Sequence, residues 1–235
     1  MDLYIIFTIV LTATIQSLFG VGILLFGTPI LLLLEYNFLD ILMILLPVSA
    51  TINLLQIWKD YKKVDRAIYK RIVLLTVPFI IIFLLLVSKN EIDINLIIGL
   101  FLIFIALKDY LPWFKILFNK LLDFDKTFYI FMGAIHGATS LGGALLTAKM
   151  FHTDLDKYEK RATTAISYLT FVVFQIAVIL YLDVKYELEY LIYIVTGLGV
   201  YLIVNRFLFN NISDSKYNLL FAIFLIISGF LLILH

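Results

Sequence analysis

The sequence predicts an all-α polytopic membrane protein. Hydrophobic residues make up 63% of the 235 residues, charged residues make up 15%, and the mean hydropathy is +1.06, whereas apolar residues are about half of a soluble domain. Apolar windows of roughly 20 residues, the length that crosses a bilayer core, recur along the whole chain. In addition, one apolar stretch near the start and another past the middle are each interrupted by glycine and hydroxyl residues.

The apolar segments form a four-plus-four pattern. They lie at residues 3–34, 41–57, 71–88, 94–111, 127–150, 162–182, 188–205 and 217–234. Sliding the first segment onto the fifth by 120 positions places Gln16 on His136 and Gly22 on Gly142. We therefore expect an internal repeat within one integral membrane domain. Its first repeat, cytoplasmic linker and second repeat are expected at 1–112, 113–126 and 127–235.

Each interrupted segment is expected to be a broken helix or a re-entrant helical hairpin. As one helix, residues 3–34 would extend about 48 Å at roughly 1.5 Å per residue, against a hydrocarbon core of about 30 Å. Glycine permits sharp turns and proline interrupts helical hydrogen bonding. Breaks are therefore available at Gly20, Gly22, Gly27 and Pro29.

The distribution of basic residues favours hairpins, because Lys and Arg accumulate in cytoplasmic loops. If both interrupted segments are hairpins, 16 of the 18 basic residues share the cytoplasmic face, whereas single crossings divide them 11 to 7. Only Lys89 and Lys185 then lie outside, in loops rich in acids. This prediction assumes that both interrupted segments behave alike.

The hairpin interpretation predicts two inverted repeats. Each repeat contains one Gly-rich hairpin and three transmembrane helices, an odd number of crossings, so the second repeat is upside down relative to the first. Both termini are then extracytoplasmic, and the hairpins approach the middle of the bilayer from opposite faces. Paired Gly-interrupted segments of this kind indicate a transport site.

The backbone at each hairpin tip is a candidate substrate site. A helix that begins inside the membrane presents unpaired N–H groups and the positive end of its dipole, which attract anions. Glycines let a ligand approach the backbone, while hydroxyl and amide side chains add hydrogen bonds. The alternative is that the glycines permit close helix packing and the polar groups link helices. The candidate substrate-binding residues are Gln16, Ser17, Gly20, Gly22, Thr51, Asn53, His136, Gly137, Thr139, Ser140, Gly142, Gly143 and Gln175.

His136 is the only histidine that the segment pattern places within the membrane. A buried imidazole could donate to an anion, or change charge near neutral pH and couple the substrate to protons. The alternative is a neutral histidine that is hydrogen-bonded across a helix contact. Because Gln16 occupies the matching position, a proton-coupling role would be asymmetric.

Several functional classes lack candidate residues. No Asp, Glu, Lys or Arg lies deep in a predicted span, the chain has no cysteine, and it has no His-Glu-x-x-His motif. A cation transporter, a resident metal or other cofactor, and a membrane enzyme with catalytic residues are therefore disfavoured. The net charge of +1 gives no bias toward nucleic acid. The start Met1-Asp2-Leu3 lacks the basic residues of a signal peptide, so we expect it to be part of the mature structure.

Three motifs suggest a family. These motifs are Gly20-Val21-Gly22 followed by Pro29, Tyr61-Lys62-Lys63-Val64-Asp65-Arg66, and Gly137 through Gly143 with Arg161-Ala162-Thr163 downstream. In them the chain resembles, over almost its whole length, the sulfite exporter TauE/SafE family of membrane permeases. The chain departs from the family where Ile23 and Leu24 replace frequent glycines and Ala144 and Leu145 replace frequent prolines.

The resemblance implies transport of small anions across the cell membrane, typically sulfite, sulfonates and related organosulfur or carboxylate compounds. We expect export by alternating access, with the anion held between the two hairpin tips. The alternatives are proton-coupled import of such anions and a non-transporting membrane accessory protein. The expected partners are the anion and the lipid bilayer, and the oligomeric state is left open.

Overall fold

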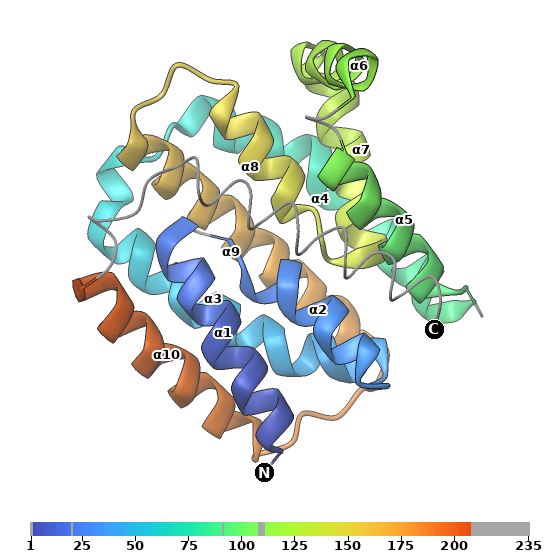
Figure 1. The fold of residues 1–235 in the computed structure, drawn as a ribbon, viewed down its shortest axis with the longest axis vertical. Helices are drawn as coiled ribbons and strands as arrows, with labels where there is room; N and C mark the ends of the chain where they lie inside the picture. The colour runs from blue at the N-terminus through green and yellow to red at the C-terminus, as the bar shows by residue number, and fades with distance from the viewer. Residues whose placement is uncertain (1, 20, 91, 108–110, 208–235) are drawn as a thin grey trace.

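The fold is all-helical, as predicted. The computed structural model describes residues 2–19, 21–90, 92–107 and 111–207 (Figure 1). Within these ranges there are ten α-helices, one 3₁₀ turn (η1) and no strand. The elements are α1 Leu3–Phe19, α2 Ile23–Leu33, α3 Phe38–Asp60, η1 Tyr61–Lys63, α4 Arg66–Lys89, α5 Ile94–Leu107, α6 Pro112–Asp123, α7 Asp125–Thr139, α8 Gly143–Phe151, α9 Lys157–Tyr181 and α10 Tyr190–Phe207.

The longest apolar helices are those expected of an integral membrane protein. Three of those in the described ranges, α3, α4 and α9, are long and apolar enough to cross a membrane, and the bent pair α5–α6 is a fourth candidate if it forms one span. Helices α1, α2 and α10 are apolar but shorter. The predicted segment at 217–234 lies outside the described residues. The predicted linker at 113–126 contains most of helix α6.

Both long Gly-bearing segments are broken where glycines and hydroxyl residues occur. The first break separates α1, which ends at Phe19, from α2, which begins at Ile23. The second separates α7, which ends at Thr139, from α8, which begins at Gly143. The breaks expected at Gly27 and Pro29 are wrong, because both residues lie inside α2 and neither ends that helix. Gly22, the N-cap of α2, lies at the break instead.

Each pair of short helices turns back on itself (Figure 1). Across the open end of the first hairpin, the Tyr36 hydroxyl after α2 donates to the Asp2 carboxylate before α1. Across the open end of the second, Lys149 Nζ of α8 lies 2.7 Å from Asp125 Oδ1 of α7. We call α1–α2 and α7–α8 the first and second hairpins.

The two hairpins open at opposite ends of the helix bundle. The first opens beside the start of α3, because Tyr36 is followed directly by the α3 N-cap, Asn37. The second opens beside the start of α4, where Arg71 forms an ion pair with Asp125. Helix α3, about 35 Å long at roughly 1.5 Å per residue, separates these two ends because α4 starts just after α3 ends.

Helices α4 and α7 pack at very short range through two glycines. A Cβ atom at Gly133 would lie 2.5 Å from the Thr76 carbonyl oxygen, and one at Gly137 would lie 2.5 Å from the Ile80 carbonyl oxygen. The Thr76 hydroxyl donates to the Tyr129 carbonyl at 3.0 Å in the same contact. The spacing Gly-x-x-x-Gly is the small-residue pattern that lets membrane helices approach closely.

We expect Gly137→Ala to destabilise the protein by about 1–3 kcal/mol, because the added methyl group must displace the α4 backbone. The matched control is Gly199→Ala in α10, where an added Cβ meets nothing within 4 Å. That change is expected to be neutral or to raise stability slightly, because alanine favours a helix more than glycine does. Thermal denaturation of the detergent-solubilised protein measures both, and equal midpoints for the two variants would contradict the packing role.

Helices α3 and α9 are joined at the end of the bundle where the second hairpin opens. The Arg161 guanidinium donates to the Asp60 carboxylate, and the Asp65 N–H donates to the Thr163 hydroxyl at 2.9 Å. The Arg161 and Asp60 side chains are only 9% and 14% exposed. Two of the three sequence motifs, one from each half of the chain, therefore meet in one contact.

Candidate functional site

At the first hairpin tip, the Gln16 side chain bridges the helix break. Gln16 lies in the last turn of α1 and is fully buried. Its Oε1 atom accepts a hydrogen bond at 3.0 Å from the N–H of Ile23, the first residue of α2. One of the free N–H groups at the start of α2 is therefore satisfied by a side chain of the preceding helix.

Helix α3 holds Gln16 in this position. The Gln16 amide nitrogen lies 3.3 Å from both the Ser49 hydroxyl and Asn53 Oδ1, and the Gln56 amide donates to the Gln16 carbonyl at 3.3 Å. Ser49, Asn53 and Gln56 are spaced i, i+4 and i+7, so they form one stripe along α3. The three side chains are buried.

At the second tip, His136 takes the place that Gln16 has in the first. His136 lies in the last turn of α7, and its Nδ1 accepts a hydrogen bond from the Gly142 N–H at 3.1 Å. Gly142 is the N-cap of α8. In each hairpin, therefore, a side chain from the end of the first arm caps the start of the second. The register that aligns Gln16 with His136 has a structural counterpart.

The hydrogen bonds around His136 fix its tautomer. Because Nδ1 accepts from Gly142, the ring proton is assigned to Nε2, which lies 3.1 Å from Gln175 Oε1 of α9. The Gln175 amide in turn donates to the Ser140 hydroxyl at 2.8 Å. A proton added at Nδ1 would meet the Gly142 N–H, so this arrangement selects the neutral imidazole.

Ser140 forms the turn of the second tip. It follows α7 in the left-handed conformation, with φ of 62° and ψ of 9°, and its N–H donates to the His136 carbonyl at 2.7 Å. This conformation is disfavoured for residues other than glycine. The bonds that Ser140 makes to Gln175 and to the Tyr168 hydroxyl, at 3.4 Å from the Ser140 carbonyl, offset that cost.

Three glycines at the tips permit close approach of neighbouring groups. At Gly22 an added Cβ would lie 2.6 Å from the backbone nitrogen of Gln16, and at Gly142 it would lie 2.5 Å from the His136 Cβ. At Gly143 it would lie 2.9 Å from the Tyr168 hydroxyl. Gly22 and Gly142 therefore allow the return arm to reach its capping side chain. These contacts support the packing alternative for both glycines.

The other predicted site residues that the structure describes do not take part in the hydrogen bonds around Gln16 and His136. The hydroxyls of Ser17, Thr51 and Thr139 each donate to the carbonyl four residues earlier in the same helix. The Thr139 hydroxyl also accepts a hydrogen bond from the Leu141 N–H at 3.1 Å, so Thr139 is part of the turn at the tip of the second hairpin. Gly137 faces α4, away from the tip, and Gly20 lies outside the described residues.

Two residues that contact the predicted site residues were not predicted from the sequence. Ser49 holds Gln16, and Tyr168 lies over the start of α8, fully buried, with its ring 5.3 Å from the His136 ring between centroids. Both have a helical-spacing signal. Ser49 precedes Asn53 by four residues, and Tyr168 precedes Gln175 by seven, so each shares a helix face with a predicted residue.

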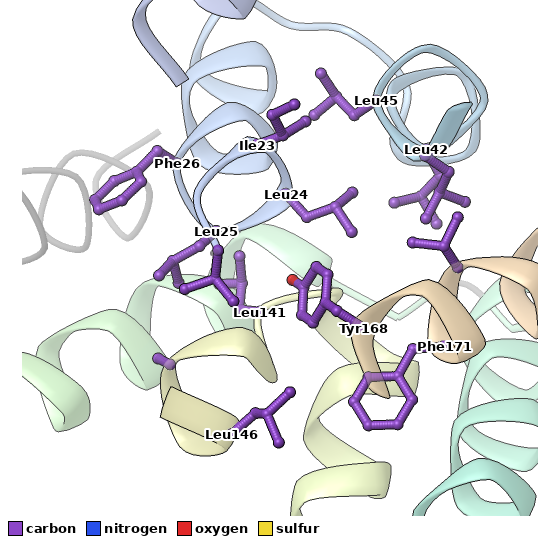
Figure 2. Close-up of a cluster of buried hydrophobic side chains, with 14 of the residues drawn as sticks. Ile23, Leu24, Leu25, Phe26, Leu42, Leu45, Leu141, Leu146, Tyr168 and Phe171 are labelled. Atoms are coloured by element: carbon purple, nitrogen blue, oxygen red, sulfur yellow. The ribbon is translucent and has the colours of Figure 1, made fainter. Parts of the chain in front are cut away.

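Apolar side chains fill the space where the hairpins meet. Figure 2 shows Tyr168 of α9 among Leu24 and Leu25 of α2 and Leu141 of the second tip. These four side chains are fully buried. The Tyr168 hydroxyl and the starts of α2 and α8 are thus enclosed in an apolar surrounding, where each polar group exerts a stronger field than it does in water.

An acidic hollow lies at the end of the bundle where the first hairpin opens. It has a volume of about 700 Å³, and its lining includes the carboxyl residues Asp2, Asp40, Glu187 and Glu189 but no Lys or Arg of the described chain. The hydrogen bond from Tyr36 lowers the pKa of Asp2, and the same bond raises the pKa of Tyr36 to about 12. Asp2 therefore stays ionised over the neutral range.

The acidic residues do not form a metal centre. Among the residues that the structure describes, no group of three or more His, Asp or Glu is placed to hold a metal ion.

Comparison with known proteins adds one finding. The model of the family described as sulfite exporter TauE/SafE matches residues 5–232, which is nearly the whole chain. The comparisons with curated proteins and with solved structures gave no match.

Proposed function

The chain belongs to the sulfite exporter TauE/SafE family, and from this premise we propose that it exports a small anion, such as sulfite or a sulfonate. Members of this family are membrane anion transporters, and the apolar helices are those of an integral membrane protein. One observation carries the more specific proposal. Two buried helix breaks each place the start of a return helix inside an apolar bundle.

The anion binds between the two hairpin tips. The first turns of α2 and α8 supply backbone N–H groups beyond those capped by Gln16 and His136, because a helix start leaves several donors unpaired. The Tyr168 hydroxyl beside Gly143 supplies a further donor. Partial charges suit an anion that must later leave, because they attract it without the full positive charge of a buried Lys or Arg.

Tyr168 has two roles in this proposal. Its hydroxyl donates to the Ser140 carbonyl at 3.4 Å, a long hydrogen bond that is readily exchanged for one to an anion. Its ring, lying among Leu24, Leu25 and Leu141, closes the contact between the hairpins. Movement of this ring would open the tips to one side of the membrane at a time.

Alternating access follows from the opposed hairpins. We infer two inverted repeats, with the basic end of the bundle in the cytoplasm and both termini outside, as the distribution of Lys and Arg predicts. The hairpins open at opposite ends, which is the arrangement that an inverted repeat produces. Small rotations of one hairpin against the other would expose the tips alternately.

The membrane potential favours export, because fixed charges at either end of the bundle alter the entry and the exit of an anion alike. A membrane potential that is negative inside assists this direction by about 2.3 kcal/mol per charge per 100 mV. The neutral tautomer of His136 fits a cycle that needs no coupled proton.

Flux in reconstituted liposomes tests the proposal. Labelled sulfite or a short sulfonate should leave liposomes faster when the imposed potential drives anions outward, and Tyr168→Phe should reduce this flux at least tenfold. Tyr201→Phe, which alters a buried tyrosine of α10, is the matched control and should retain flux. Absence of flux with either anion, or flux insensitive to voltage, would reject electrogenic export.

The same liposomes distinguish the alternative of proton-coupled import. In that mechanism a proton gradient directed into the liposomes, without any membrane potential, drives accumulation of the anion inside them. A non-transporting accessory protein would give no flux under either gradient.

A further inference from the structure

Helix α6 has two apolar faces, only one of which the bundle covers. On the covered face Phe118 and Leu122 are buried, and the Phe118 ring lies 6.2 Å from that of Phe104 and 6.5 Å from that of Phe128 between centroids. On the other face Trp113 and Leu117 are 63% and 57% exposed. The covered face fixes the helix to the protein, and the open face requires a different partner.

The exposed side of α6 carries apolar residues around Lys120 and polar residues farther round the helix. Lys120 follows Leu117 by three residues and Trp113 by seven, so it lies beside them at helical spacing. Ile116, which is 70% exposed, borders Lys120 on its other side. The remaining exposed side is polar and consists of Lys115, Asn119 and Asp123. The order around the helix is therefore bundle-facing, then apolar and open around Lys120, then polar.

The direction of α6 places the open face along a membrane surface. The axes of α5 and α6 differ by 102°, and α5 is an apolar helix whose Phe101, Leu102 and Ile105 pack into the bundle. A helix nearly perpendicular to a membrane-embedded one runs parallel to the bilayer plane. Figure 1 shows α6 projecting from the bundle at one end.

Tryptophan and a hydrogen bond from α8 set the depth of α6. Its last turn is held at the basic end of the bundle, because Lys149 Nζ donates to the Leu122 carbonyl. Both tryptophans of the chain are at this end, since Trp58, 87% exposed, precedes the end of α3 by two residues. Tryptophan collects at the headgroup level of a bilayer. This end of the bundle thus marks the membrane–water boundary.

We propose that α6 is an interfacial helix that binds anionic phospholipid headgroups through Lys115 and Lys120. Trp113 and Leu117 enter the boundary between headgroups and acyl chains, while the lysine stems follow that boundary and place their ammonium groups at the phosphates. An open apolar face beside Lys120 favours a lipid over a free phosphate. Each lysine near an anionic surface is expected to raise lipid binding about fivefold.

Fluorescence quenching by brominated lipid tests this placement. In the Trp58→Phe protein, Trp113 is the only tryptophan, and the full chain is reconstituted in mixed phosphatidylglycerol and phosphatidylcholine with bromine on one lipid at a time. We expect Trp113 to be quenched several-fold more per molecule by the brominated phosphatidylglycerol. Bromines near the headgroup should quench more than bromines near the chain end.

Lysine variants separate the two parts of the proposal. Lys115→Ala with Lys120→Ala should remove most of the preference for phosphatidylglycerol, whereas the control Lys62→Ala with Lys63→Ala, in exposed η1, should preserve it. Equal quenching by the two lipids, or a preference that survives loss of both α6 lysines, overturns anionic recognition. No quenching, or stronger quenching from the chain ends, overturns the interfacial position.

Discussion

His136→Gln is expected to retain anion flux within a few-fold of the unaltered protein, whereas His136→Leu is expected to reduce it by more than tenfold. Glutamine can accept from the Gly142 N–H and donate to Gln175, as the imidazole does at 3.1 Å in each case. The first tip already uses this solution, with Gln16 accepting from Ile23. Leucine leaves both partners unpaired, and each buried unpaired group costs about 1–3 kcal/mol.

The pH profile of flux decides between the two roles of His136. If the imidazole only caps α8, His136→Gln and the unaltered protein have the same profile. If it carries a proton, His136→Gln loses the pH dependence and the coupled flux while its thermal stability is unchanged. Gln16→His is the reciprocal control, because it places an imidazole at the tip where none occurs.

Asp60→Ala is expected to have the largest effect on stability, about 3–5 kcal/mol, because it removes the Asp60 carboxylate from the Arg161 guanidinium, which is in a poorly solvated position. Both side chains are largely buried, at 14% and 9% exposure. Their contact joins α3 to α9. Thermal denaturation in detergent, followed by size-exclusion chromatography of the folded fraction, measures the loss.

A double-mutant cycle and an exposed ion pair provide the controls. Asp60→Leu with Arg161→Met removes both charges and should be less destabilising than either single change. Lys63→Ala breaks a pair with Asp156 that spans 3.8 Å with both side chains 51% exposed, so it should cost less than about 1 kcal/mol. Equal effects of Asp60→Ala and Lys63→Ala would contradict a structural role for the buried pair.

The sequence was sufficient to predict the helical class and the positions of the two breaks. Glycine and hydroxyl residues interrupt apolar runs too long for one crossing, and the structure ends α1 and α7 at those residues. The 120-residue register also aligned Gln16 with His136. It succeeded because a side chain that caps the next helix must lie at a fixed distance before the break.

The roles of individual tip residues depended on tertiary contacts. The sequence predicts that Gly137 belongs to the tip of the second hairpin, but in the structure the α4 backbone lies against it. Tyr168 reads like an ordinary aromatic residue of a span, and only the approach of α8 places its hydroxyl at a helix start. The segment at 113–126 was predicted to be a polar linker because its lysines lower the average hydropathy of a short segment. The structure places helix α6, which has two apolar faces, in this segment.

The glycine contact between α4 and α7 also bears on how the chain is made. Helix α4 emerges from the ribosome well before Gly133 and Gly137, so its glycine-facing groove at Thr76 and Ile80 has no occupant while the N-terminal half is being synthesised. The contact between α4 and α7 can form only after α7 has also been inserted into the bilayer. Assembly therefore ends late, after translation has passed the middle of the chain.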